Sequence, residues 1–90
     1  MLEGTVKVIN PLGLHMRAAA QLVRYASKCQ SSITISRPGN NLSADAKSIL
    51  SLLTLAASMG TVLEIHVTGV DENQSFTKIS EIFSSGFGEL

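Results

Sequence analysis

The stretch Asn10-Pro11-Leu12-Gly13-Leu14-His15-Met16-Arg17-Ala18-Ala19-Ala20 contains the point at which an extended segment becomes a helix. A strand-like run at residues 5–9 leads into it, and the Asn-Pro pair followed by Gly13 is typical of a turn. After His15, apolar residues recur at the spacing of one helix face, at Ala19, Leu22, Val23 and Ala26. His15 is therefore predicted to lie where a turn gives way to a helix.

The start of a helix is a natural site for an anion, because its first N–H groups are unpaired and the helix dipole is positive there. Arg17 adds a positive charge within the predicted first turn. His15, Arg17 and the open backbone amides can therefore converge on a volume the size of one phosphate group.

Three interpretations of His15 remain open at this point. It can simply begin a helix, with Arg17 solvated. It can bind a metal ion, but His66 and Cys29 lie far along the chain and no carboxylate is near in sequence, so the ligand spacing of a metal site is missing. It can also act as a nucleophile that carries a phosphoryl group.

Length and composition predict a single small domain, residues 1–90, with a modest core. Seven basic and seven acidic residues balance, so no charge excess points to nucleic acid. One cysteine cannot form an internal disulfide, which is compatible with a reducing compartment. The first four residues lack the features of a secretory signal, and the longest mostly apolar run, residues 49–59, is well short of the ~20 residues of a membrane span. We expect a soluble cytoplasmic protein without membrane insertion.

The rest of the chain predicts an alternation of strands and helices. Strands are expected at residues 5–9, 32–36, 42–44 and 62–68, and helices at about 16–28, from Asp45 or Ala46 to a C-cap at Gly60, and at about 72–84. The order β-α-β-β-α-β-α predicts an α+β open-faced sandwich, in which a four-stranded antiparallel sheet carries three helices on one face. Alternation in the last strand predicts that Leu63, Ile65 and Val67 face inward and His66 faces solvent.

The second predicted helix is apolar on nearly every side, whereas a surface helix in a small domain normally has one apolar stripe. Some side chain among Ile49, Leu50 and Leu53 is therefore expected to face outward. An exposed apolar patch often marks a partner surface. The alternative, that this helix is simply well buried, stays open.

The run from Leu12 to Ala19 resembles the phosphohistidine signature of the HPr family, the histidine-containing phosphocarriers of the phosphoenolpyruvate-dependent phosphotransferase system, of either the sugar branch or the nitrogen branch. Ala46-Lys47-Ser48-Ile49-Leu50 resembles the second signature of the family, around a regulatory serine. One departure is Ala18, where the family usually has proline. The resemblance implies the same open sandwich, with the other face of the sheet in solvent.

The resemblance also implies roles for individual residues. His15 would accept the phosphoryl group on its pros nitrogen, Nδ1, and the phosphoryl group would be stabilised at the helix start by Met16, Arg17 and Ala18. Ser48 would be a regulatory site for a serine kinase. The partner surface would consist of Met16, Ala20, Arg24, Ile49, Leu50 and Leu53.

By the same resemblance, the donor would be phospho-Enzyme I or its nitrogen-branch relative, and the acceptors would be IIA domains. The alternative function is a regulatory interaction protein of the same fold, which docks through the second helix and is controlled at Ser48. A turnover enzyme is disfavoured because no second catalytic group stands at readable spacing from His15. We therefore expect a stoichiometric phosphoryl carrier that is monomeric and uses no cofactor.

Overall fold

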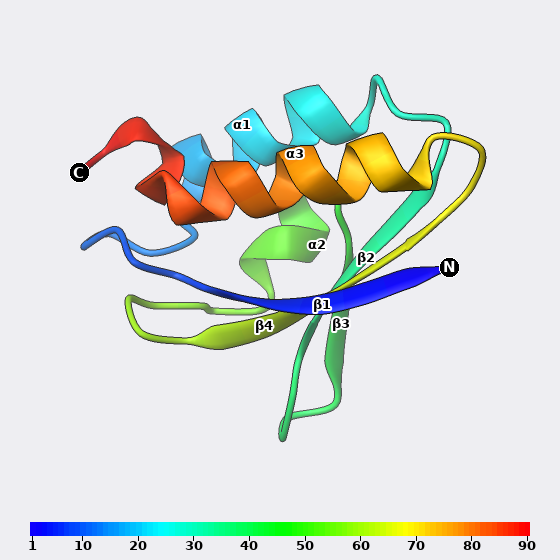
Figure 1. Ribbon diagram of the computed structural model, residues 1–90. Helices are drawn as coiled ribbons and strands as arrows, with labels where there is room; N and C mark the ends of the chain where they lie inside the picture. Colours follow the sequence, from blue (N-terminus) through cyan, green and yellow to red (C-terminus); the bar gives the residue numbers. More distant parts are fainter.

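The computed structural model describes residues 1–90 and contains one antiparallel sheet with its helices on one side. The elements are β1 (Leu2–Lys7), α1 (Met16–Ala26), β2 (Ser32–Arg37), β3 (Leu42–Asp45), α2 (Ile49–Leu53), β4 (Val62–Thr68), α3 (Glu72–Ser84) and a short 3-10 turn, η1 (Gly86–Gly88). The strand order is β1-β4-β2-β3, and the helices gather above one face (Figure 1). The predicted α+β open-faced sandwich is confirmed.

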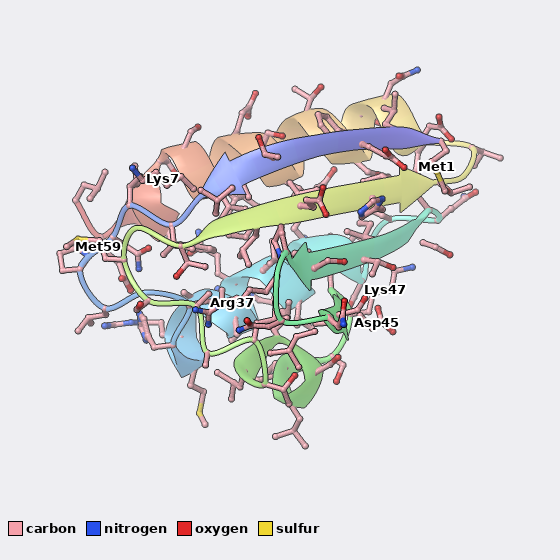
Figure 2. All side chains as sticks on the ribbon, turned by 90° about the horizontal axis from the view of Figure 1, so that it is seen from below. Met1, Lys7, Arg37, Asp45, Lys47 and Met59 are labelled. Carbon is pink, nitrogen blue, oxygen red and sulfur yellow. The ribbon has the colours of Figure 1, made fainter.

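The core lies between this sheet and the helices. Leu63, Ile65 and Val67 of β4 are fully buried. His66 lies between them in sequence and on the opposite face, where its Nδ1 is 3.4 Å from a carboxylate oxygen of Glu3. Figure 2 shows this open face from below, with the helices behind the sheet. The alternation predicted for β4 is therefore confirmed.

α3 has the bounds that the sequence predicts, and it crosses β1 at close range. Ile79 and Phe83 are buried, whereas Phe76 is half-buried against the core. The ring of Phe76 lies over Gly4 of β1, so close that a Cβ at Gly4 would be 2.5 Å from its Cζ. Only glycine leaves room for this contact. None of the helices combines the length and the apolarity needed to cross a membrane.

Several element ends differ from the sequence prediction by a few residues. β1 begins at Leu2 because it pairs with β4 along its whole length, so pairing across the sheet extends it beyond its apolar run. α1 ends at Ala26, because the amides that follow Ser27, those of Lys28 and Cys29, donate to carbonyls three residues earlier in tight turns.

α2 differs most from the prediction. It was expected to start at Asp45 or Ala46, but it spans only Ile49–Leu53. Asp45 instead ends β3, and the Ala46 N–H donates to the carbonyl of Ile33 at 3.0 Å. Sheet pairing therefore holds both residues, and the helix begins only after Ser48.

The predicted end of this helix was also wrong. After Leu53 the chain leaves the helix, and Ala56 adopts φ +49°, in the left-handed region. Gly60 does not cap the helix; it lies in the turn before β4, where its N–H donates to the carbonyl of Val8 at 2.7 Å. An apolar run signals that a segment is buried, but it does not locate the end of a helix.

Candidate functional site

His15 is the residue immediately before α1, in extended conformation with φ −82° and ψ −179°. Its carbonyl accepts the first helical hydrogen bond, from the Ala19 N–H at 2.8 Å, and its side chain does not cap the helix. The backbone N–H groups of Met16, Arg17 and Ala18 have no hydrogen-bond partner. The predicted turn-to-helix boundary with open amides is confirmed.

The turn before His15 is fixed from two sides. Asn10 is fully buried, and its Nδ2 donates to the carbonyl of Gly13 at 2.9 Å. The Leu14 N–H donates to the carbonyl of Ala57 at 2.8 Å. Gly13 has φ +70°, and a Cβ there would lie 2.6 Å from the Ala57 oxygen. This turn therefore requires glycine at position 13, for both its conformation and its close contact.

The imidazole of His15 contacts a carboxylate that comes from the C-terminal tail. Its Nε2 lies 2.7 Å from Oε2 of Glu89, which is also 3.5 Å from Nε of Arg17. The other oxygen of Glu89 accepts from Nδ2 of Asn10 at 2.8 Å. The Asn10 hydrogen bond, with His15 and Arg17 nearby, holds the pKa of the Glu89 carboxyl below its ordinary value.

This contact assigns the proton on the imidazole ring. An ionised carboxylate can only accept hydrogen bonds, so Nε2 of His15 must be the nitrogen that carries hydrogen toward Glu89. No hydrogen bond reaches Nδ1, which keeps its lone pair in the neutral tautomer. The two ring nitrogens therefore have different surroundings, and only Nδ1 is free of a hydrogen-bond partner.

Glu89 is the site residue that sequence reasoning missed, because it stands 74 residues after His15. The tail turns back through η1, where Phe87 has φ +57° and packs edge-on against Phe83 with ring centroids 5.1 Å apart. Figure 1 shows the C-terminus beside the start of α1. The only signal in the sequence is an aromatic residue between two glycines just before Glu89, which permits a sharp, buried turn but does not say where it leads.

A hollow of about 560 Å³ opens beside this pair and is lined by both arginines of α1, Arg17 and Arg24, together with Glu89. The Arg17 side chain is 76% exposed, so its guanidinium is free to reach toward an incoming anion. The positive charge that the sequence placed in the first turn is therefore available next to His15.

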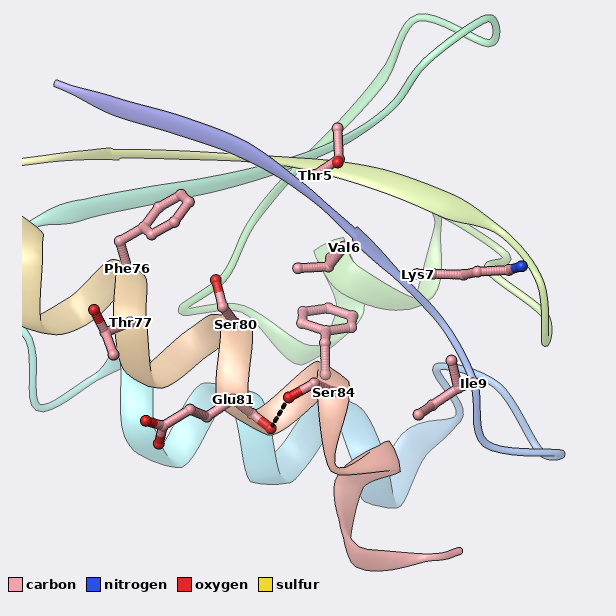
Figure 3. A pocket seen from close by; sticks show the side chains of 10 residues that line it. Thr5, Val6, Lys7, Ile9, Phe76, Thr77, Ser80, Glu81 and Ser84 are labelled. Carbon is pink, nitrogen blue, oxygen red and sulfur yellow. Dashed lines mark hydrogen bonds between the residues drawn. The ribbon is translucent and has the colours of Figure 1, made fainter.

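A second groove, of about 610 Å³, lies between β1 and α3 and holds none of the predicted site residues. Figure 3 shows its lining, with Val6 of β1 on one side and Phe76 and Ser80 of α3 on the other. The hydrogen bond drawn there runs from the Ser84 hydroxyl to the Glu81 carbonyl, at 3.1 Å. This groove offers an apolar surface, but it does not bring together a pair of catalytic groups such as a nucleophile and a base.

Ser48 is the N-cap of α2 rather than a residue of its first turn. Its Oγ accepts a hydrogen bond from the Ser51 N–H at 3.2 Å, and the residue is half-buried. Capping is thus one role of this serine.

The residues predicted for the partner surface lie on α1 and α2, two helices in contact with each other. Leu50 is 77% exposed and Met16 is 65% exposed, so the prediction that the second helix turns an apolar side chain outward is confirmed. Arg24 is exposed, whereas Ala20, Ile49 and Leu53 are half-buried. Two further exposed apolar residues that the sequence did not single out are Leu12, in the turn before His15, and Met59, in the turn before β4.

Comparison with known proteins adds an independent finding. The family model described as PTS HPr component phosphorylation site matches residues 2–85. The phosphocarrier protein HPr of Xylella fastidiosa (strain Temecula1 / ATCC 700964) is 45% identical over 89 residues, which cover 99% of this chain and 98% of that protein. HPr of Neisseria meningitidis serogroup B is 35% identical over the same length, with the same coverage. The crystal structure of HPr-C-His from Thermoanaerobacter tengcongensis covers 100% of this chain and 99% of its own, with a TM-score of 0.92 and 36% identity.

Proposed function

The chain belongs to the HPr family and is a phosphocarrier of the phosphotransferase system, and on that premise we propose that it carries the phosphoryl group on Nδ1 of His15. The observation that carries this assignment is the 2.7 Å contact between Nε2 and Glu89, which leaves Nδ1 as the nitrogen with a free lone pair. The open amides at the start of α1 and the Arg17 guanidinium are the groups available to hold the phosphoryl oxygens.

The transfer step follows from this geometry. Nδ1 forms a bond to phosphorus while the bond between phosphorus and the donor breaks. Nε2 keeps its hydrogen and continues to donate it to the Glu89 carboxylate. The phosphorylated ring then carries positive charge, which the carboxylate offsets. The same carboxylate repels the phosphoryl oxygens, so the group is held only weakly and can leave again. Ala18 in place of the usual proline leaves this chemistry intact, because proline at a helix start is favourable but not required.

The carrier must dock on a donor and then on acceptors. Enzyme I, or its nitrogen-branch relative, is the proposed donor, and IIA domains are the proposed acceptors. The exposure of Leu50, Met16 and Arg24 supports docking through the surface formed by Met16, Ala20, Arg24, Ile49, Leu50 and Leu53. A serine kinase acting on Ser48 would add charge at the edge of this surface.

Residues 1–90 then act as one phosphocarrier domain, monomeric and cytoplasmic, that is modified stoichiometrically rather than turning over a substrate. Nothing in the comparisons favours the regulatory alternative over this function. Light scattering coupled to size exclusion tests the monomer directly.

Labelling with Enzyme I and radioactive phosphoenolpyruvate tests the assignment of His15. We expect one acid-labile phosphoryl group per chain in the wild type and none in His15→Ala. His66→Ala is the matched control, because His66 is the only other histidine and lies on the open face of the sheet. Normal labelling of His15→Ala, or loss of labelling only in His66→Ala, would remove the proposal.

A further inference from the structure

We infer that Arg37, the last residue of β2, is a positioning residue for His15 that acts through the segment of residues 54–58. The inference rests on the proposed role of His15 as the phosphoryl acceptor. Arg37 lies outside both signature segments, and nothing in its sequence neighbourhood links it to the site.

Arg37 holds the segment that follows α2 by two hydrogen bonds. Its Nη1 donates to the carbonyl of Leu55 at 2.9 Å and to the carbonyl of Ala56 at 3.0 Å. Neither carbonyl accepts any other hydrogen bond. Hydrogen bonds from a charged donor are roughly twice as strong as neutral ones, so this single guanidinium fixes two successive peptide units.

The segment needs such support because its backbone is unfavourable without it. Ala56 has φ +49°, a region that residues with a Cβ adopt only when the surrounding structure enforces it. α2 is only one turn long and supplies little rigidity of its own. Without Arg37, we therefore expect the segment after α2 to relax toward other conformations.

The next residue transmits this position to the site. The carbonyl of Ala57 accepts the Leu14 N–H at 2.8 Å and lies against Gly13, where a Cβ would be only 2.6 Å away. Leu14 and Ala57 are both buried, so neither can shift alone. Leu14 directly precedes His15, and a small hollow of about 230 Å³ is lined by His15 and by Ala56 to Ser58 together.

A shift of the Ala57 carbonyl would therefore move the His15 ring relative to Glu89 and to the open amides of α1. Reactive geometry is sensitive to displacements of this kind, since an error of about 1 Å can cost as much as about 100-fold in rate. Arg37 thus contributes to phosphoryl transfer without touching the phosphoryl group.

The test compares Arg37→Met, which removes both hydrogen bonds, with Arg37→Lys, whose ammonium group can donate to two carbonyls. We expect Arg37→Met to lower kcat/KM for phosphorylation by Enzyme I about ten-fold, mainly through kcat. Hydrogen exchange of the Leu14 amide should accelerate about ten-fold as well, while the amide of Ile65 in the core of the sheet keeps its protection. Arg37→Lys should recover most of both losses.

Lys78→Met is the matched control, because it also removes one positive charge, from an exposed position on α3 where Lys78 makes no ion pair. Repeating the assay at about 0.5 M salt separates docking electrostatics from positioning, since long-range attraction is screened there. The inference is overturned if the loss in Arg37→Met disappears at high salt, equals that of Lys78→Met, or occurs with unchanged Leu14 exchange. Arg37→Gln, a milder change, replaces Arg37→Met if that variant does not fold.

The two proposals can fail separately. A wild-type protein that is not labelled on His15 would remove the proposed function and, with it, the role of Arg37 in transfer. A wild-type protein that is labelled normally, with Arg37→Met labelled at the same rate, would remove only the inference about Arg37.

Discussion

The two nitrogens of His15 have different surroundings, and this difference rests on one residue. Nε2 faces Glu89 at 2.7 Å, while Nδ1 has no hydrogen-bond partner. A carboxylate that orients an imidazole selects its tautomer and stabilises the positive charge that the ring gains in the reaction. Glu89 is therefore expected to matter for the chemistry of His15 more than for the stability of the fold.

Glu89→Gln tests this at the scale of the residue. The amide keeps the size of the side chain but loses the charge and can present a donor to Nε2. We expect phosphoryl transfer to slow by roughly ten-fold and the ring to become a mixture of tautomers. Nitrogen chemical shifts of the imidazole report the tautomer directly. Glu81→Gln, an exposed carboxylate on α3, is the control, and a wild-type tautomer in Glu89→Gln would contradict the role assigned to Glu89.

Residue-scale prediction from the sequence succeeded where the partners are close in the chain. The turn residues before His15 and the helical spacing after it located the boundary, and Arg17 followed within one turn. Glu89 could not be found this way, because its position depends on the path of a buried tail around Phe87. No local sequence pattern encodes a contact between residues that lie so far apart in the chain.

At the scale of elements, one carboxylate ties α3 to the start of β2. Asp71 accepts hydrogen bonds from the backbone amides of Gln30 and Ser31, both at 2.9 Å, and from the Ser31 hydroxyl. The pKa of Asp71 is lowered from its ordinary 3.8 to about 2. The hydrogen bond from the Ser31 hydroxyl contributes most to this shift, and the one from the Gln30 amide contributes next most. The connection between these elements therefore depends on the ionised carboxylate.

The sign of the pH effect follows from this shift. Because the pKa of Asp71 is lower in the folded chain, its stabilisation is present above the unfolded value and is lost as pH falls through the folded value. We expect the free energy of unfolding to decline between about pH 4 and about pH 2, and Asp71→Asn to be less stable at neutral pH and to show less of this decline. Denaturant unfolding over that range measures both. Equal slopes for Asp71→Asn and the wild type would show that the decline comes from other groups.

α2 supplies a second prediction at this scale. Its Ser48 cap accepts the Ser51 N–H, so Ser48→Ala should destabilise the protein by about 1 kcal/mol. Ser48→Asp keeps an acceptor at the cap and places negative charge at a helix N-terminus, so it should keep the wild-type melting temperature. The added charge lies beside Leu50, and we expect it to weaken phosphoryl transfer from Enzyme I.

Ser32→Asp, on the open face of the sheet, is the control for added charge. Transfer rates measured at low salt, where repulsion is least screened, should separate the two variants. If Ser48→Asp accepts phosphoryl groups as fast as the wild type, capping is the whole role of Ser48.

At the scale of the whole molecule, the sequence predicted which layer each element joins better than it predicted where each one ends. Period-two alternation in β4 and helical spacing in α1 and α3 are properties of the buried face, and burial is what the apolar pattern encodes. The prediction of the ends of α2 failed because its apolar residues lie on two surfaces, one in the core and one exposed. Leu52 enters the core while Leu50 faces solvent, so no single stripe marked the start or end of the helix.

The exposed side of α2 leads to a prediction about binding. Leu50 is 77% exposed, so Leu50→Ser removes little buried surface and should change the free energy of unfolding by no more than about 0.5 kcal/mol. The same side chain lies on the proposed docking surface, where its apolar atoms are buried from water only when the partner binds. We therefore expect Leu50→Ser to raise KM for phosphorylation by Enzyme I about ten-fold with little change in kcat, because the His15 site itself is intact.

Val70→Ser is the matched control for this prediction. Val70 is 86% exposed, but it lies in the turn between β4 and α3, away from the residues assigned to docking. If exposed apolar area anywhere on the molecule assisted docking, both variants would raise KM equally. A raised KM for Leu50→Ser alone places the contact on the exposed side of α2. A lowered kcat at unchanged KM would instead mean that Leu50 acts on the chemistry and that the docking surface lies elsewhere.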